Sequence, residues 1–141
     1  MLVQTGYIVG APTYLPVGEL ALCQPLVGEV PRPEFPAALA AGAATRWRGR
    51  ASAALMFANI HARLGDPVCC AGMLVEAVLC AAHGRLAQRR EWVLNEKRLV
   101  QRAGLQDARP VLARPGSTSK ELLASVALVS ATLRIDPLTG R

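Results

Sequence analysis

The sequence predicts a mostly α-helical fold, a bundle of four to five helices with a short N-terminal β/loop segment. Of the 141 residues, 52% are hydrophobic but only 4% are aromatic, so the core must be built from Ala, Leu and Val. Such small and aliphatic side chains favour closely packed helices over a sandwich of β-sheets. From Phe35 onward the apolar residues recur at helical spacing. A chain of this length is expected to form one core.

The first 33 residues are divided into short pieces by closely spaced glycines and prolines, so only brief elements fit there. Tyr7 to Val9 suits a strand, and Pro16 to Cys23 suits a short helix with proline in its first turn. We therefore assign residues 1–33 to a linker and strand segment and residues 34–141 to a helical bundle domain.

Two helices are expected between Phe35 and Gly65. The first spans Phe35–Ala44. The second ends at Gly65, because glycine readily adopts the left-handed conformation that terminates helices. Its apolar stripe, which we expect to face the core, is formed by Met56, Phe57, Ile60 and Leu64.

Later helices also carry start and stop signals. Asp66 followed by Pro67 is typical of a helix N-terminus. A further helix is expected to end at Gly104, and the last to begin with a capping box from Thr118 to Glu121. The helix after Asp66 has the apolar stripe Val68, Ala71, Val75, Val78, Ala82 and Leu86, and the last helix has Leu122, Val126, Val129 and Leu133.

The net charge of +6 favours an anionic partner, which could be a nucleotide, a nucleic acid strand or an acidic protein surface. The arginines are dispersed in short groups, a pattern that solvated helix faces also produce. Because aromatic residues are sparse, a base-stacking surface for nucleic acid is not expected.

The four cysteines lack the paired spacings of a zinc site, so no metal site is predicted. They are interpreted as small apolar residues in a reducing compartment. The longest apolar tract, Val68 to Ala82, is interrupted by Glu76 and is short for a membrane span. The N-terminus has no basic flank ahead of an apolar stretch, so we predict a cytoplasmic protein without a membrane partner.

The stretch from Asn95 to Arg98 is the first candidate site. If Asn95 is a helix N-cap, Lys97 and Arg98 lie in the first turn, where the helix dipole disfavours cations and a bound anion would compensate them. Asn95, Lys97 and Arg98 are therefore candidate nucleotide-binding residues. In the alternative register the helix starts at Glu91 and Glu96 lies on its apolar face, which is costly unless the carboxylate is paired.

Glu76 is the second candidate. Its helical neighbours include Met73, Leu79 and Cys80, so its surroundings are largely apolar, and a carboxylate made more basic by desolvation could act as a general base on a substrate hydroxyl. The alternative is an ion pair with an arginine of a neighbouring helix, Arg50 or Arg63. His61 and His83 are interpreted as ordinary polar residues.

A family resemblance rests on Asp66 to Leu105, with its Ala-rich helix, its basic Arg85–Arg90 stretch and the sequence Trp92 to Leu99. This region is similar to the C-terminal helical domain of bacterial nucleotidyltransferases of the aminoglycoside-modifying type. Gly6 to Pro16 resembles the passage that joins their catalytic sheet to that domain. The resemblance implies a nucleoside triphosphate and Mg²⁺ as ligands, with Lys97 approaching the triphosphate.

The family's reaction requires a Gly-Ser loop and an Asp-x-Asp pair that binds Mg²⁺. Here the aspartates are Asp66, Asp107 and Asp136, and no two have that spacing. The resemblance thus implies a chain that lacks the catalytic domain, by truncation or because another chain supplies it. We expect a nucleotide- and substrate-binding domain that is inactive alone, and whether the chain is an enzyme is left open. The alternatives are an interaction domain without ligand, which pairs with a partner or with itself, and a basic nucleic-acid-binding domain.

Overall fold

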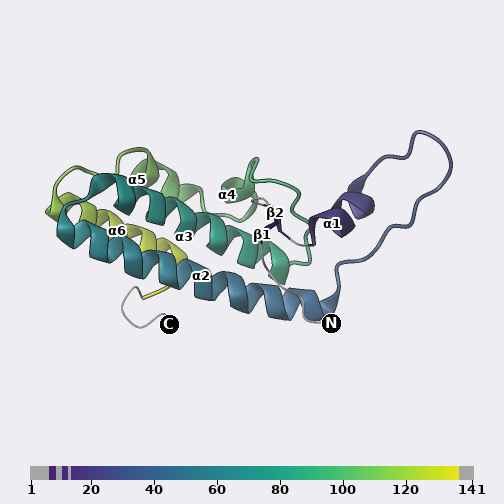
Figure 1. Cartoon of the computed structure of the whole chain (residues 1–141), viewed down its shortest axis with the longest axis horizontal. Helices are drawn as coiled ribbons and strands as arrows, with labels where there is room; N and C mark the ends of the chain where they lie inside the picture. Colours follow the sequence, from purple (N-terminus) through teal and green to yellow (C-terminus); the bar gives the residue numbers. More distant parts are fainter. Residues whose placement is uncertain (1–6, 9–10, 13, 137–141) are drawn as a thin grey trace.

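The computed structural model describes residues 7–8, 11–12 and 14–136, and it confirms a mostly α-helical bundle. Two long antiparallel helices, α2 (Ala37–Leu64) and α3 (Pro67–Gln88), lie side by side along the molecule (Figure 1). The C-terminal helix α6 (Ser119–Leu133) packs against both of them. These three helices bury most of the core.

Shorter elements cover one side and one end of this bundle. The N-terminal segment contains two antiparallel strands of two residues each and one short helix. The connection from α3 to α6 contains three short helical elements (Figure 1). These elements are β1 (Tyr7–Ile8), β2 (Ala11–Pro12), α1 (Leu15–Leu22), α4 (Leu99–Arg102), the 3₁₀-helix η1 (Gln106–Ala108) and α5 (Arg109–Ala113). The expected strand and first helix are therefore present, although Val9 lies outside the described residues.

Helix α2 corrects the expectation of two separate helices, because the helix expected over Phe35–Ala44 begins at Ala37 and continues without a break to Leu64. Gly42 and Gly49 lie inside it, but alanines and other helix formers surround them and outweigh a cost of about 1 kcal/mol for each glycine. Gly65 ends the helix as predicted, with a φ of 69° in the left-handed region.

The expected core stripe of α2 is wrong. Met56, Phe57, Ile60 and Leu64 are 44–74% exposed, and Val68 and Val75 of α3 are 79% and 40% exposed. The buried side of α2 is instead built mainly from alanines, which let two helices approach closely. These buried residues include Ala43, Trp47, Ala51, Ala54, Leu55, Ala58 and Ala62.

The predicted helix starts at Asp66 and Thr118 are confirmed. Asp66 Oδ1 accepts hydrogen bonds from the N–H groups of Val68 and Cys69 at 3.1 and 3.0 Å. At α6, Thr118 Oγ1 accepts from the N–H of Glu121 at 3.3 Å, and Glu121 Oε2 accepts from the N–H of Thr118 at 3.0 Å. Helix α6 also buries the predicted residues, Leu122, Val126, Val129 and Leu133.

The N-terminal segment is joined to the bundle by aromatic contacts on Trp92. The rings of Tyr14 and Phe35 lie with their centroids 6.4 and 4.6 Å from that of Trp92. A Cβ atom at Gly18 would lie 3.1 Å from the Trp92 ring, so α1 packs closely there. The boundary between residues 33 and 34 stays a prediction.

Helix α3 is long and apolar enough to cross a membrane, by length and composition. In its most apolar stretch 44% of the residues are buried inside the fold, and the helix packs against α2 and α6. Core helices of soluble proteins meet the same criterion. The predicted cytoplasmic location stays a prediction.

Candidate functional site

The stretch from Asn95 to Arg98 is a loop, which corrects both predicted helix registers. Helix α4 begins only at Leu99 and has four residues, and Arg98 precedes it with a φ of 57°. Asn95 Oδ1 accepts a hydrogen bond from the N–H of Lys97 at 3.0 Å, so Asn95 stabilises a turn and caps no helix. The helix-dipole argument for a phosphate at this place therefore does not hold.

Buried residues on either side anchor this loop. Trp92, Val93 and Leu99 are buried, whereas Glu96 and its neighbours up to Arg98 are exposed. An exposed Glu96 avoids the burial cost that the helical register starting at Glu91 would impose. Arg102 Nη2 holds the loop's beginning by donating to the Trp92 carbonyl at 3.0 Å.

The predicted nucleotide-binding residues do not line one common pocket. Asn95 lines a small pocket of about 530 Å³ together with Trp92, Arg102 and residues of α1 and the loop. Lys97 and Arg98 line neither this pocket nor the larger one described below.

Glu76 forms the ion pair that was the alternative to a catalytic role. Its Oε1 lies 3.3 Å from Arg50 Nη2, and about two-fifths of each side chain is exposed. The carboxylate is thus engaged on the α2–α3 surface. Its action as a general base stays a prediction.

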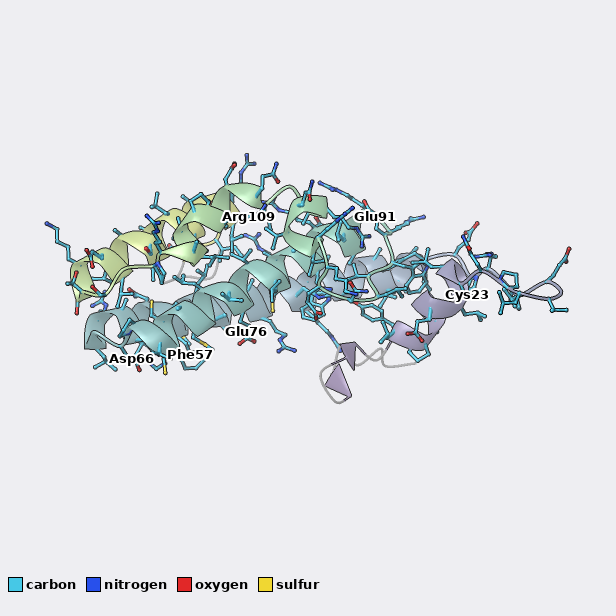
Figure 2. All side chains as sticks on the ribbon, turned by 90° about the horizontal axis from the view of Figure 1, so that it is seen from above. Cys23, Phe57, Asp66, Glu76, Glu91 and Arg109 are labelled. Atoms are coloured by element: carbon cyan, nitrogen blue, oxygen red, sulfur yellow. The ribbon has the colours of Figure 1, made fainter. Side chains whose placement is uncertain are left out.

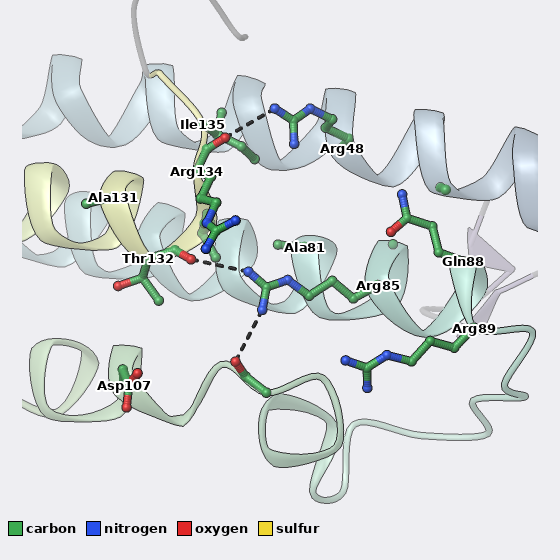
Figure 3. Close-up of a pocket in the computed structure, with 14 residues that line it drawn as sticks. Arg48, Ala81, Arg85, Gln88, Arg89, Asp107, Ala131, Thr132, Arg134 and Ile135 are labelled. Carbon is green, nitrogen blue, oxygen red and sulfur yellow. Dashed lines mark hydrogen bonds between the residues drawn. The ribbon is translucent and has the colours of Figure 1, made fainter.

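A larger cleft of about 770 Å³ lies between α2, α3, the end of α6 and the segment from α4 to η1 (Figure 3). We call it the arginine cleft. Figure 3 shows the side chains of Arg85 and Arg89, from the C-terminal end of α3, and of Arg134, from the end of α6, extending into it. Its polar and charged lining residues include Arg48, Arg85, Gln88, Arg89, Asp107 and Arg134.

The guanidinium groups of the cleft bind carbonyl groups at the C-terminal ends of helices. Arg85 Nη1 donates to the carbonyls of Ala103 and Gly104 at 3.3 and 3.2 Å, and its Nη2 donates to Thr132 at 3.3 Å. These carbonyls have no partner within their helices and carry partial negative charge. The arginine thereby connects α3 to the ends of α4 and α6.

Two more arginines follow the same principle. Arg48 Nη2 donates to the Arg134 carbonyl at 3.2 Å, and Arg89 Nη1 donates to the Arg102 carbonyl at 3.0 Å. Because each guanidinium group has five N–H donors, these contacts leave further donors. The carbonyl groups carry only partial charges, so the positive charge of the arginines is not neutralised.

The cleft is strongly electropositive. Four arginines line it, and Asp107 is the one acidic residue among its lining residues. Burial lowers the pKa of Arg85, and the positive charges of Arg134 and Arg89 lower it further. Such mutual repulsion is relieved by a bound anion, so the cleft is the best candidate for an anion-binding site in the described part of the chain.

Sequence reasoning did not find this cleft. Arg48 and Arg134 are 86 residues apart, and no spacing rule connects them. One local signal was available, because Arg85 and Arg89 are four residues apart and so share one face of α3. In the sequence, however, Arg85, Arg89 and Arg90 form only one of several dispersed basic groups.

His83 is a core residue, which corrects its interpretation as an ordinary polar side chain. It is 2% exposed and stacks on Trp47 with the ring centroids 4.5 Å apart. Neither ring nitrogen has a hydrogen-bond partner among the described residues. Burial lowers its pKa to about 4.

The cysteines fit their interpretation only in part. Cys70 and Cys80 are buried, as small apolar residues would be, whereas Cys69 is exposed and Cys23 is half-buried. All four are free thiols.

Comparison with protein-family models, curated proteins and solved structures found no match to this chain, so the nucleotidyltransferase resemblance stays a hypothesis.

Proposed function

We propose that this chain is a helical domain that binds a phosphorylated anion, such as a nucleoside triphosphate, in the arginine cleft and catalyses no reaction alone. The observation that supports this most is that four arginines from three helical elements line one cleft with a single carboxylate. A volume of about 770 Å³ is within the range of small-molecule sites. The ligand class agrees with the nucleotidyltransferase resemblance, but the binding residues differ from Lys97.

Guanidinium groups suit this ligand because their planar N–H pairs match the oxygens of a phosphate group. Arg89 and Arg134 lie at the cleft with exposed side chains, so a ligand can reach them. Arg85 and Arg48 also hold helix ends and would orient the charged surface beneath the ligand.

The residues do not fit the magnesium site that the resemblance implies. Asp107 is the one acidic residue among those that line the cleft, and the sequence has no Asp-x-Asp pair. A nucleotidyl transfer step would need such a pair to hold the metal. We therefore propose binding alone and derive no metal-dependent reaction for this chain.

Replacing Arg89 by Gln, or Arg134 by Asn, should weaken ATP binding by about tenfold each, a loss of about 1.4 kcal/mol per charge-assisted contact. Asn is chosen at position 134 because Arg134 has a φ of 57°, which Asn tolerates. Isothermal titration calorimetry with ATP, repeated with inorganic pyrophosphate, measures the effect and shows whether phosphate groups are recognised.

Two variants test the location of this site. Arg114→Gln removes an arginine at the end of α5 that does not line the cleft, and it should leave ATP affinity unchanged. Lys97→Ala tests the loop that the sequence favoured. A larger loss for Lys97→Ala than for Arg89→Gln would move the site to that loop. Equal losses in all variants, with steep salt dependence, would indicate non-specific attraction of polyanions.

The exposed apolar residues favour a second function. The outer face of the α2–α3 hairpin lies on the side away from α6, and Figure 2 shows Phe57 there between Asp66 and Glu76. Contiguous exposed apolar surfaces of this kind are typical of protein interaction sites. We define this apolar face by its large exposed residues, Met56, Phe57, Ile60, Leu64, Val68 and Val75.

We infer that a second copy of the chain covers the apolar face. Charged residues beside this face include Arg50 and Glu76, which pair with each other, and Arg63 and Asp66 near the turn. Their formal charges cancel, whereas the whole chain carries +6. Two such faces can therefore meet without the repulsion that the net charge would cause elsewhere.

Size-exclusion chromatography with light scattering tests this inference. The wild-type chain should be a dimer at micromolar concentration, with or without ATP, and Ile60→Glu should be a monomer because it would bury charge. Leu128→Glu is the matched control, since Leu128 is 57% exposed on α6 outside the apolar face, and it should stay dimeric. A monomeric wild-type chain would exclude this second function.

A further inference from the structure

Three potential metal ligands meet at the turn of the α2–α3 hairpin. His61 belongs to the last turn of α2, Asp66 is the N-cap of α3, and Cys69 follows in the first turn of α3. His61 contributes an imidazole nitrogen, Asp66 a carboxylate oxygen and Cys69 its Sγ, and the three atoms lie within 4.8 Å of one another. The turn thus gathers nitrogen, oxygen and sulfur donors at one point.

The imidazole of His61 has an unsatisfied nitrogen that a metal ion could bind. Its Nδ1 is shielded from solvent and has no hydrogen-bond partner among the described residues. It faces Asp66 Oδ2 at 3.7 Å, which is too long for a hydrogen bond. A shielded imidazole nitrogen without a partner is costly, and a bound cation would satisfy it.

Asp66 is already positioned for such a role. Its Oδ1 caps α3 by accepting from the N–H groups of Val68 and Cys69, which fixes the carboxylate at the helix start. The other oxygen, Oδ2, is the one that faces His61. Carboxylates held by hydrogen bonds in this way make pre-oriented metal ligands. Cys69 is exposed, so a metal ion can reach its sulfur from solvent.

We propose that His61, Asp66 and Cys69 bind one Zn²⁺ ion at the hairpin turn. Zn²⁺ accepts nitrogen, carboxylate oxygen and thiolate sulfur at about 2.0–2.3 Å in tetrahedral geometry, so small side-chain movements would bring the three donors together. Mg²⁺ and Ca²⁺ are poor candidates because they avoid sulfur. The Cys69 thiol releases its proton to solvent on binding. Three protein ligands leave a fourth position for water.

This site is separate from the arginine cleft. Arg85, which lines the cleft, lies about 24 Å along α3 from Cys69 at 1.5 Å per residue. The sequence predicts no metal site, because its cysteines lack the paired spacings typical of zinc sites. His61 and Cys69 come close to each other only because the chain reverses direction after Gly65, which ends α2.

The full chain is first treated with a chelator. Isothermal titration calorimetry with Zn²⁺ should then show one ion bound per chain. Titration with Co²⁺ should produce the intense visible bands of a tetrahedral site and a sulfur-to-cobalt charge-transfer band. Cys69→Ser should abolish the charge-transfer band, and His61→Ala should weaken Zn²⁺ binding by at least about a hundredfold, as loss of a direct ligand does.

Two further variants complete the test. Cys23→Ser removes a thiol far from the turn and should leave both spectra and affinity unchanged. Asp66→Asn keeps a good helix cap but loses the charge, so it should weaken Zn²⁺ binding without unfolding α3, as circular dichroism would show. The proposal is overturned if the wild-type chain binds no Zn²⁺. It is also overturned if His61→Ala and Cys69→Ser bind Zn²⁺ as tightly as the wild type.

Discussion

Acidification from about pH 7.5 to about pH 4.5 should lower the free energy of unfolding by about 2.5 kcal/mol, because His83 is buried in its neutral form. The pKa of His83 is lowered from 6.5 to about 4 in the folded chain. Each unit of difference corresponds to about 1.4 kcal/mol. Since the unfolded chain takes up the proton more readily, stability is complete above pH 6.5 and is lost as the pH falls toward 4.

The surroundings of His83 explain this expectation. Its ring lies against Trp47, and no described group accepts a hydrogen bond from either nitrogen. Burial is the largest cause of the lowered pKa; Glu96 opposes it, and the positive charges of Arg102 and Arg50 add to it. A protonated ring would therefore be a buried cation without a partner, which folded proteins avoid.

Urea denaturation at pH 7.5 and at pH 4.5 measures the effect. His83→Phe keeps an aromatic ring against Trp47 but cannot take up a proton, so most of the loss should vanish in that variant. His61→Gln removes the other histidine and should retain the loss. The pKa of Glu121 is lowered to about 2 by backbone N–H groups, so its contribution is lost only below about pH 4.5. An unchanged pH dependence in His83→Phe would contradict the prediction.

Replacing Arg85 by Met should destabilise the chain by about 3 kcal/mol, because it removes charge-assisted hydrogen bonds to the ends of two helices at once. The carbonyls of Ala103 and Thr132 would lose their donor in a half-buried place, and the exposed carbonyl of Gly104 would lose it as well. Met retains most of the aliphatic packing of the arginine stem, so the loss reports on the hydrogen bonds.

Equilibrium denaturation without ligand measures this loss, and two variants define its origin. Arg85→Lys should be intermediate, because a single ammonium group cannot reach both helix ends with the geometry of a planar guanidinium group. Arg63→Met changes an exposed arginine near the end of α2 and should alter stability by less than about 0.5 kcal/mol. Equal stabilities of Arg85→Met and Arg63→Met would show that Arg85 does not connect the helices.

The local sequence alone determined the fold class and most helix ends. Gly65, Asp66 and the capping box from Thr118 to Glu121 were predicted correctly because each signal acts within a few residues. The buried stripe of α6 was also predicted, because Leu122, Val126, Val129 and Leu133 recur at helical spacing. The ion pair between Arg50 and Glu76 was one of the stated alternatives.

Only the tertiary structure decided which surfaces face the core and which are free. Close packing of α2 on α3 selects the alanine side of α2, so larger residues such as Phe57 and Ile60 stay exposed although hydrophobicity alone ranks them first for burial. The loop before α4 follows the anchoring of Trp92 and Leu99, which outweighs its helical pattern.

The candidate sites also depend on distant parts of the chain. The arginine cleft exists because the end of α6 meets α2 and α3, which brings the Arg134 carbonyl to Arg48 across 86 residues of sequence. The net charge indicates an anionic partner, but it does not show where on the molecule that partner binds. Residue spacing describes one helix at a time, whereas a site between helices is set by how their side chains pack, and that packing is what the tertiary structure adds.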